Sequence, residues 1–516
     1  MKKIILLSIL LITYTQVTDA QNIRKFDIDV NKEKGKLDTF FKECIGAGRA
    51  NEGLRADWQE QLKMVKDDCG FKFIRFHGIF HDDMGVYRES EDGEPIYNWM
   101  YIDKLYDYIL SIGMKPFVEM SFMPKDLASG EETVFWWKGN ITPPKSYEKY
   151  SKFIKAFVQH LTNRYGEQEV SSWYFEVWNE PNLNFFWTGG FDGYEKMYQS
   201  AVKVIKEVSN TYRVGGPATA GAGWVKEHLE YCEKENVPCE FVATHAYNVS
   251  GFLDEFGTSQ LKMLDSPNDV TNQVIKARNQ IDDTSFSGLE LHLTEWSSSY
   301  SPLDPVHDTY QNATFILNTL KNVEGKVSSM SYWVFTDIFE ESGVPAIPFH
   351  GGFGLVNLQG IKKPTYYAYK YLNELGETEL ENSDKNSWVC KDENGVQILI
   401  YDFTYLKQGK ESNKVFFTKK HKAKEVATSE ISLTNLKDGK YQLLVYKTGY
   451  LNNDAFTNYY NLGMPSQLSK KQTDFLKSVT NNQPLINKVV SVTSGAFSTS
   501  VKLNENDIVL VKLNKL

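Results

Sequence analysis

The segment SWYFEVWNEPNL (Ser172–Leu183) combines two features that decide the fold and the site. From Trp173 onward it is a short apolar run rich in aromatic residues, a pattern that predicts a buried strand. The run ends at Asn179-Glu180-Pro181, because a proline cannot continue a central strand. A carboxylate is thereby placed at a strand end, beside an amide and tryptophan rings.

Seven further runs of this kind flank the segment, and amphipathic helical patterns lie between them. Two helices are especially clear: apolar stripes run over 99–110 and 150–161, and Gly113 and Gly166 stand where helix-ending glycines are expected. Eight strand–helix repeats predict an α/β fold, a (β/α)8 TIM barrel with its chemistry at the C-terminal strand ends. A doubly wound open sheet is the alternative, but no glycine-rich phosphate loop follows the first strand. The predicted strands are Glu43–Ala50, Phe71–Gly78, Lys115–Phe122, Trp173–Asn179, Arg213–Thr219, Phe241–Tyr247, Leu289–Trp296 and Met330–Thr336.

The pattern changes after about Leu375. Runs such as GVQILIYDF (Gly395–Phe403), YQLLVYKTGY (Tyr441–Tyr450) and DIVLVKLN (Asp507–Asn514) read as strands, with no convincing helix between most of them. We therefore expect a catalytic barrel over residues 21–375 and a C-terminal β-sandwich accessory domain over residues 376–516.

Composition and charge narrow the classes of function. The 516-residue chain carries a net charge of −9 and lacks long basic runs, which argues against a nucleic-acid surface. Aromatic residues make up 14% of the chain, and ten of the 11 tryptophans lie between Trp58 and Trp333. Core packing accounts for most such rings, but their clustering modestly favours a cleft with ring faces for stacking.

The first 20 residues, MKKIILLSILLITYTQVTDA, have the lysines, apolar run and small-residue end of a secretory signal peptide. We expect cleavage before Gln21 and a periplasmic or secreted protein, and no other segment reaches membrane-spanning length. The five cysteines are scattered, so no disulfide framework is predicted. Only Cys232 and Cys239 are close enough in sequence to leave a bridge open, and no cysteine has metal-ligand spacing.

Two glutamates at strand ends are the candidate catalytic pair. Glu180 closes the fourth predicted strand and Glu295 closes the seventh, in LELHLTEWSSSY. A single glutamate at such a place is usually solvated or salt-bridged, but opposed strands of a barrel can bring two carboxyl groups together across its mouth. Such a pair can cleave a glycosidic bond: a separation of about 5–5.5 Å suits a retaining enzyme, and about 6.5–9.5 Å suits an inverting one.

The surroundings suggest a role for each glutamate. Glu180 lies near tryptophans, whose rings would shield its carboxyl from water. This desolvation would raise the pKa of Glu180 and suit a proton donor. Glu295 should stay ionised and needs hydrogen-bond donors. Four residues at the ends of other strands could supply them, although each could equally make a structural core hydrogen bond: Arg75, His77, His245 and Tyr247.

Six segments together resemble glycoside hydrolase family 39, best known for β-xylosidases and also containing α-L-iduronidases. NEP alone is common among barrel glycosidases, whereas HGIFHDDM with FHGGFGL is more specific. The similarity covers most of the barrel, from about Cys44 to Tyr369. The segments are GRANEGLRADWQEQL, FIRFHGIFHDDMGVY, EVWNEPNL, LTEWSSSY, SYWVFTDIFEE and PFHGGFGLVNLQGIKKPTYYAY.

The resemblance implies a retaining double displacement without cofactor or metal, with Glu180 as acid/base and Glu295 as nucleophile. It implies sugar contacts from Asn179 and His77. It also implies that the regions of Glu340-Glu341 and of Phe349-His350-Gly351 shape the sugar-holding pocket. Whether Glu340 or Glu341 faces the site is left open. From the strand ends and the resemblance together, the predicted substrate-binding residues are His77, Asn179, His245, Tyr247, Trp333, Glu340, Glu341 and His350.

Together these features predict an exo-acting β-xylosidase that releases terminal xylose from oligosaccharides. Alternatives are an α-L-arabinopyranoside, β-glucoside, β-galactoside or iduronide as substrate, because the residues after Glu295 depart from the pattern of many family xylosidases. An iduronidase should offer a basic group to the substrate carboxylate, and the matched motifs show none. A sugar-binding protein without catalysis would usually lack one carboxylate, and here both are present. The oligomeric state is left open, a homo-oligomer included.

Overall fold

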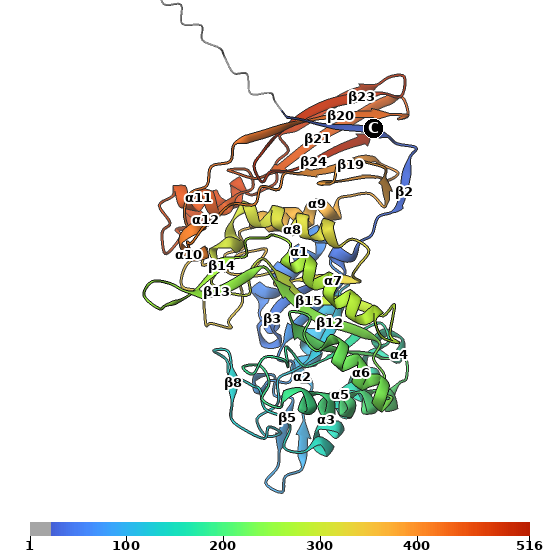
Figure 1. Ribbon diagram of the computed structural model, residues 1–516, viewed down its shortest axis with the longest axis vertical. Helices are drawn as coiled ribbons and strands as arrows, with labels where there is room; N and C mark the ends of the chain where they lie inside the picture. The colour runs from blue at the N-terminus through green and yellow to red at the C-terminus, as the bar shows by residue number, and fades with distance from the viewer. Residues whose placement is uncertain (1–21) are drawn as a thin grey trace, which may run out of the picture.

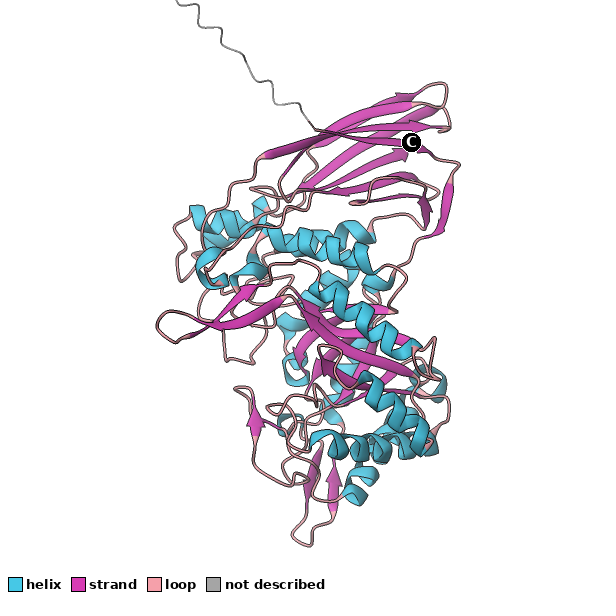
Figure 2. Cartoon of the chain, in the orientation of Figure 1, coloured by secondary structure: helices cyan, strands magenta, loops and turns pink. Residues whose placement is uncertain are grey.

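The computed structural model describes residues 22–516, so the predicted signal peptide lies outside the described residues. The chain forms a barrel surrounded by helices and, stacked on one side of it, a body built of sheets (Figures 1 and 2). In this part of the chain no helix is both long enough and apolar enough to cross a bilayer.

The barrel is a closed ring of eight strands in which every neighbouring pair is parallel. Each of the eight predicted strands forms, with bounds that differ by a few residues, and the ring closes where Tyr332 pairs with Ile45. The prediction of a (β/α)8 barrel is confirmed. The strands, in chain order, are β3 (Cys44–Arg49), β4 (Phe73–His77), β7 (Lys115–Met120), β10 (Tyr174–Val177), β11 (Arg213–Ala220), β12 (Phe241–Tyr247), β15 (Glu290–Ser297) and β16 (Ser329–Tyr332).

A helix follows each barrel strand and buries its apolar face against the sheet. The two stripes read from the sequence become α2 and α3, and Gly113 and Gly166 stand just past their ends with φ of 75° and 84°, a conformation that glycine adopts without strain. The helices are α1 (Ala56–Cys69), α2 (Met100–Ser111), α3 (Tyr147–Tyr165), α5 (Gly190–Val208), α6 (Val225–Glu235), α7 (Asp269–Asp282), α8 (Tyr310–Val323) and α9 (Pro364–Asn373), and the short α4 (Glu167–Val170) follows α3.

The loops at the C-terminal strand ends carry small hairpins. The loop after β7 also contacts the loop after β16, where the Trp136 amide donates to the Glu341 carbonyl at 2.8 Å. These loops build the walls above the barrel mouth. The hairpins are β5 (Tyr87–Glu89) with β6 (Pro95–Tyr97), β8 (Thr133–Val134) with β9 (Gly139–Asn140), and β13 (Val249–Leu253) with β14 (Ser259–Met263).

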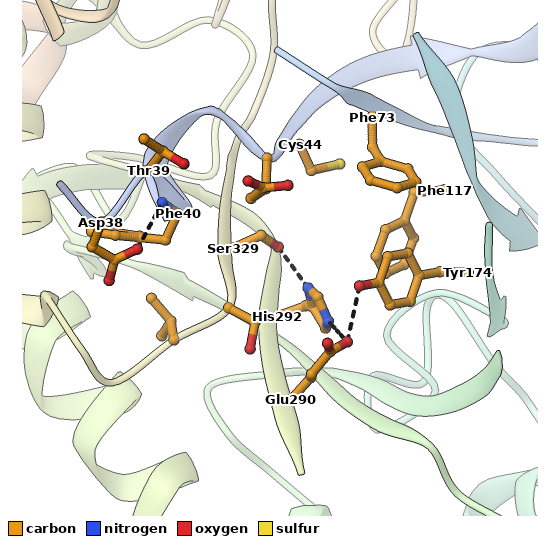
Figure 3. Close-up of a pocket in the computed structure, with 13 residues that line it drawn as sticks. Asp38, Thr39, Phe40, Cys44, Phe73, Phe117, Tyr174, Glu290, His292 and Ser329 are labelled. Carbon is orange, nitrogen blue, oxygen red and sulfur yellow. Dashed lines mark hydrogen bonds and ion pairs between the residues drawn. The ribbon is translucent and has the colours of Figure 1, made fainter. Parts of the chain in front are cut away.

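The opposite, N-terminal end of the barrel holds a small polar cavity of about 210 Å³ (Figure 3). His292 lies in its wall, between the Ser329 hydroxyl at 2.7 Å and the Glu290 carboxylate at 3.2 Å. Beside His292 the rings of Phe117 and Tyr174 stack on each other, with their centroids 4.7 Å apart. Since TIM-barrel chemistry lies at the other end of the strands, we read this cavity as part of the packed floor.

The second body is a pair of packed sheets, one of seven strands and one of three, with a shared apolar core. The predicted β-sandwich therefore forms. Its C-terminal strands are β17 (Thr378–Leu380), β18 (Ser387–Lys391), β19 (Gly395–Tyr401), β20 (Glu425–Thr434), β21 (Gly439–Thr448), β22 (Ile486–Val492), β23 (Phe497–Asn504) and β24 (Ile508–Lys515).

The N-terminal strands belong to this sandwich and not to the barrel, which corrects the placement of all of residues 21–375 in the barrel. Strand β1 (Ile23–Asp29) pairs in parallel with β20, and β2 (Glu33–Lys36) pairs with β17. Phe26 and Ile28 are 1% exposed in the sandwich core. Burial of these side chains requires strands that are distant in sequence, so the local pattern could not assign them.

Three short helices also interrupt the sandwich sequence, where strands were expected to dominate. Phe456 and Leu476 from two of them pack against Phe349 and Ile361 of the barrel loops. This contact joins the sandwich to the catalytic body. The five cysteines, all within the described residues, are buried free thiols, and Cys232 and Cys239 form no bridge. The helices are α10 (Asn413–Phe416), α11 (Ala455–Asn461) and α12 (Lys470–Val479).

Candidate active site

The chain turns sharply where β10 ends. Trp178 and Glu180 have φ of 71° and 45°, a left-handed conformation that costs a non-glycine residue about 1–2 kcal/mol. Two hydrogen bonds hold this turn: the Glu180 amide donates to the Ala218 carbonyl at 2.8 Å, and the Trp178 indole donates to the Phe186 carbonyl at 2.9 Å. The strained turn points the Glu180 carboxyl into the barrel mouth.

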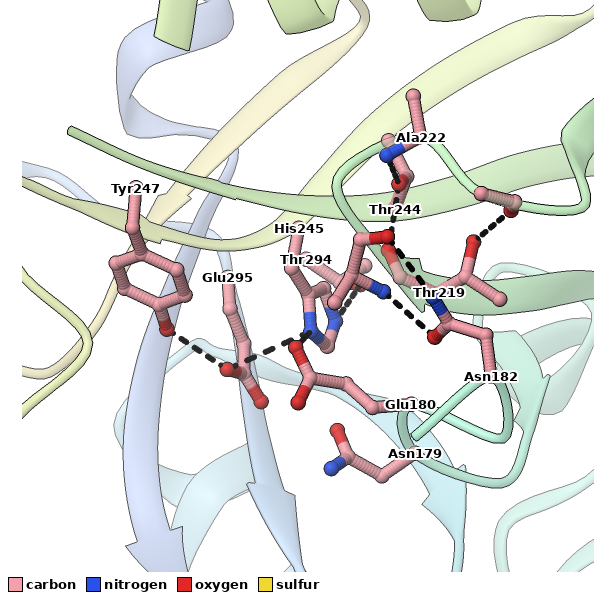
Figure 4. A network of polar contacts seen from close by, with 12 residues as sticks. Asn179, Glu180, Asn182, Thr219, Ala222, Thr244, His245, Tyr247, Thr294 and Glu295 are labelled. Atoms are coloured by element: carbon pink, nitrogen blue, oxygen red, sulfur yellow. Dashed lines mark hydrogen bonds and ion pairs between the residues drawn. The ribbon is translucent and has the colours of Figure 1, made fainter. Parts of the chain in front are cut away.

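Glu180 and Glu295 meet there (Figure 4). Both are buried, at 7% and 5% exposed, and one oxygen of each lies within 4.8 Å of the other and of a His245 ring nitrogen. Such a close approach is typical of the carboxyl pair of a retaining glycosidase, which lies closer together than the pair of an inverting one. The geometry therefore fits the retaining mechanism, in which one carboxylate attacks the sugar directly.

The surroundings of Glu180 favour the protonated acid. Burial raises the pKa of Glu180 to about 7. His245 Nδ1 lies 2.8 Å from Glu180 Oε1, and burial lowers the pKa of His245 to about 3, so the ring is neutral. No full cation therefore touches Glu180, and near neutral pH it can hold a proton to donate.

Hydrogen-bond donors surround the carboxylate of Glu295. Arg75 Nη1 donates to Oε1 at 2.7 Å, and the Tyr247 hydroxyl donates to Oε2 at 2.8 Å. His77 Nε2 lies 3.5 Å from Oε1, and His245 Nδ1 lies 3.5 Å from Oε2. The structure thus gathers all four strand-end residues named from the sequence around Glu295.

Two further buried carboxylates, which sequence reasoning missed, share Arg75 with Glu295. Arg75 Nη2 lies 2.8 Å from Glu119 and Arg75 Nε lies 2.6 Å from Glu176, and all three side chains are fully buried. Glu119 also accepts from His77 Nδ1 at 2.7 Å. A glutamate in the middle of an otherwise apolar barrel strand, as in KPFVEM and WYFEVW, was the available signal, because a buried charge is informative.

Asn179 and Trp333 complete the floor of the site. Asn179 Oδ1 accepts from Arg75 at 2.9 Å, while its Nδ2 is buried and has no hydrogen-bond partner within residues 22–516. This free donor suits a sugar hydroxyl. The Trp333 ring lies 4.7 Å from the His77 ring and 5.6 Å from the Arg75 guanidinium carbon, beside two of the residues that surround Glu295.

The acidic pair after β16 divides into an inward and an outward residue. Glu341 faces the site, with Oε1 3.6 Å from His77 Nε2, and burial together with the nearby Glu295 raises its pKa. Glu340 is turned away and pairs with Arg55 at 2.9 Å and Arg49 at 3.4 Å. The tertiary structure thus resolves which of the two acids points inward.

His350 does not join the carboxylate cluster. Its ring lies against Gly352, where any Cβ would come within 2.6 Å of His350 Nε2. His350 Nδ1 is buried without a partner in the described part of the chain. The assignment of His350 to the sugar-holding pocket therefore stays a prediction from the sequence.

Two triplets in the site have the spacing of metal ligands: His77 with Glu119 and Glu295, and Glu180 with His245 and Glu295. Arg75 already pairs with Glu119 and Glu295 at 2.7–2.8 Å, so a second positive charge there would be repelled. The donor set is better explained as an acid, a nucleophile and the groups that hold them.

Comparisons with known proteins agree with this geometry. The model of the family described as "Glycosyl hydrolases family 39" matches residues 24–496. A β-xylosidase of Caldicellulosiruptor saccharolyticus is 44% identical over 71% of this chain and 75% of its own length. One from Geobacillus stearothermophilus is 37% identical over 92% and 93%. The crystal structure of a monomeric β-xylosidase from Caulobacter crescentus is 43% identical, covers 96% of this chain and 100% of its own, and superposes with a TM-score of 0.93.

Proposed function

The chain belongs to glycoside hydrolase family 39, and on that premise we propose that it is a retaining exo-β-xylosidase that releases terminal xylose from oligosaccharides. The observation that carries the proposal is the close approach of Glu180 and Glu295, with oxygens within 4.8 Å. The environments of the two carboxyls differ in the way that the two catalytic roles require.

In the first step Glu295 attacks C1 of the sugar while Glu180 gives its proton to the glycosidic oxygen. The C1–O bond breaks, its electron pair leaves with the alcohol, and the sugar stays as an ester on Glu295. In the second step ionised Glu180 takes a proton from water, the water oxygen attacks C1, and Glu295 is released.

The neighbouring residues support these steps. Arg75 and Tyr247 stabilise the carboxylate of Glu295 as attacking and as leaving group, through bonds of 2.7 and 2.8 Å. Asn179 Nδ2, a buried donor without a protein partner in the described chain, can bind a sugar hydroxyl as positive charge develops at the ring.

The charges of the pocket favour a neutral sugar. Glu341 lines it, Arg75 is already paired with three carboxyl groups, and Arg49 is already paired with Asp83 and with Glu340. A uronide carboxylate would therefore meet acids and find no unpaired cation among these groups, which argues against an iduronide. The β-xylosidase names of the similar proteins favour xylose over the other neutral pyranosides.

A panel of nitrophenyl glycosides tests the proposal, with β-D-xyloside against α-L-arabinopyranoside, β-glucoside, β-galactoside and iduronide. We expect the highest kcat/KM on the xyloside. Glu295→Ala should lose turnover and, with azide, give a glycosyl azide of inverted configuration. A faster reaction on another sugar would replace the substrate, and full turnover by Glu295→Gln would refute the nucleophile.

The proposal extends to location. The pattern of residues 1–20 supports export to the periplasm or the exterior. N-terminal sequencing of the protein from fractionated cells should find Gln21 as the first residue, and an uncleaved cytoplasmic protein would contradict it.

A further inference from the structure

A buried line of side chains runs behind the acid/base. His245 Nδ1 lies 2.8 Å from Glu180 Oε1, and on the other side of the ring His245 Nε2 lies 3.1 Å from the Thr294 hydroxyl (Figure 4). Both His245 and Thr294 are fully buried. A neutral imidazole has one N–H, so the group that Nε2 contacts decides whether Nδ1 carries the proton and donates it to Glu180.

Glu176 stands at the far end of this line. Its carboxyl, fully buried, accepts from Arg75 Nε at 2.6 Å through Oε2. Its Oε1 has no hydrogen-bond partner in the described chain, and the Thr294 hydroxyl is close enough to the Glu176 carboxyl to lower its pKa against the larger effect of burial. A buried carboxylate oxygen without a donor is costly, whereas a protonated carboxyl becomes a donor itself.

The neighbouring Glu119 shows the contrast. Glu176 and Glu119 are register partners on adjacent strands, but Glu119 accepts from Arg75, His77 and Ser121. Burial acts to raise the pKa of Glu119, yet Arg75 and His77 outweigh it and the net pKa is lowered. Burial raises the pKa of Glu176 to about 7.

One cation is therefore shared by three carboxyl groups, of which Glu119 and Glu295 have further hydrogen-bond donors. Arg75 pairs with Glu119, Glu176 and Glu295, but Glu295 also has Tyr247 as a donor. Cys44 of β3 and Tyr194 of α5 also interact electrostatically with Glu176, and burial raises the pKa of both groups, which keeps them neutral. Glu176 is thus the carboxyl in the group that most readily takes a proton.

We propose that Glu176 is protonated in the resting enzyme and, as a positioning residue, begins an oriented hydrogen-bond chain through Thr294 and His245 to Glu180. Glu176 Oε1 donates to the Thr294 oxygen, and the Thr294 hydroxyl donates to His245 Nε2. His245 Nδ1–H then donates to Glu180 Oε1. The transferable proton of Glu180 is thereby kept on Oε2, the oxygen left free for the leaving group.

Thr294→Val tests the chain because it removes the hydroxyl and keeps the shape. Without that donor, His245 can carry its proton on Nε2, and Nδ1 then draws the Glu180 proton to the wrong oxygen. We expect kcat/KM on xylobiose to fall about tenfold, a fraction of the 100- to 10,000-fold that general acid catalysis supplies. A dinitrophenyl xyloside, whose leaving group needs no proton, should lose less than about twofold.

Two matched variants keep the inference open to refutation. Thr294→Ser retains the hydroxyl and should recover most of the xylobiose rate, and Glu176→Gln, whose amide can still donate to Thr294, should lose only about threefold. Equal losses on both substrates, no loss in Thr294→Val, or a Glu176→Gln loss as large as that of Thr294→Val would overturn the chain. Thermal unfolding of each variant identifies one that fails to fold.

An infrared measurement reads the proton without relying on turnover. Below pH 7 the difference spectrum between wild type and Glu176→Gln should contain the band of a protonated carboxyl, and a carboxylate band in its place would refute the assignment. The inference rests on the proposed function, but the two fail differently. An inactive wild type would remove the xylosidase, whereas an active wild type with unaffected variants would remove only the chain.

Discussion

Replacement of Glu180 by alanine should separate the step that needs a proton donor from the step that does not. General acid catalysis contributes about 100- to 10,000-fold, or about 3–5 kcal/mol of barrier. Because burial raises the pKa of Glu180 to about 7, the acid is almost fully protonated at pH 5 and its whole contribution is then lost. Xylobiose hydrolysis should fall by that factor, and cleavage of a dinitrophenyl xyloside should be limited only by the slowed second step.

The dependence on pH has a definite sign. The protonated form of Glu180 exists below its pKa of about 7, so wild-type kcat/KM should fall as pH rises through that value, and this limb should vanish in Glu180→Ala. Steady-state kinetics between pH 4 and pH 9 measures both. Azide should restore the second step and yield a xylosyl azide of retained configuration, because it enters on the face that Glu180 occupied.

Two results would refute this reasoning. An equal loss on both substrates would mean that Glu180 supports the structure and does not donate the proton. A basic limb that persists near pH 7 in Glu180→Ala would assign that titration to another buried acid of the site.

Three further perturbations test other parts of the site. Tyr247→Phe loses a 2.8 Å hydrogen bond to Glu295, and since such a bond to a charged group contributes about 1.5–3 kcal/mol, kcat/KM should fall about 10- to 150-fold; a smaller loss than threefold would contradict the contact. Glu341→Gln should change KM and kcat for xylosides. Glu340→Gln loses two arginine pairs and should mainly lower Tm by a few degrees. If Glu340→Gln changed the kinetics and Glu341→Gln only the Tm, the two roles would be exchanged. Glu180→Gln should raise the free energy of unfolding by about 2 kcal/mol near pH 8 and by little at pH 4.5. The reason is that the buried charge of Glu180 destabilises the native state only once the pH exceeds the unfolded pKa of 4.5. Denaturant unfolding at both pH values measures this difference.

The active site also illustrates why a protein keeps an unfavourable buried network. Arg75 and the carboxylate of Glu119 are fully buried, and taking such charges out of water costs several kcal/mol per ion. The turn at Trp178 and Glu180 adds backbone strain. In return, the buried network and the strained turn hold two carboxyl groups in different environments within a few ångströms of each other, which is the arrangement that the reaction needs.

Much of the catalytic pair could be predicted because it depends on local sequence. Glu180 and Glu295 follow strongly apolar strands, and in a barrel all C-terminal strand ends share one rim. Arg75, His77, His245 and Tyr247 were candidates for the same reason. What each contacts depends on how the strands are rotated and registered around the ring, which no local pattern reports.

The sequence alone determined the eight strand–helix repeats, the helix ends at Gly113 and Gly166, and two glutamates at strand ends, since these follow from hydrophobic period and from backbone chemistry. Only the tertiary structure decided that β1 and β2 join the sandwich, that Glu341 and not Glu340 faces the site, and that Arg75 is shared with Glu119 and Glu176. The physical reason is that side-chain direction and long-range pairing are set by packing between segments far apart in the chain. The same packing brings Thr294 and Glu176 behind the acid, where the sequence shows only a threonine beside the nucleophile and a glutamate within an apolar strand.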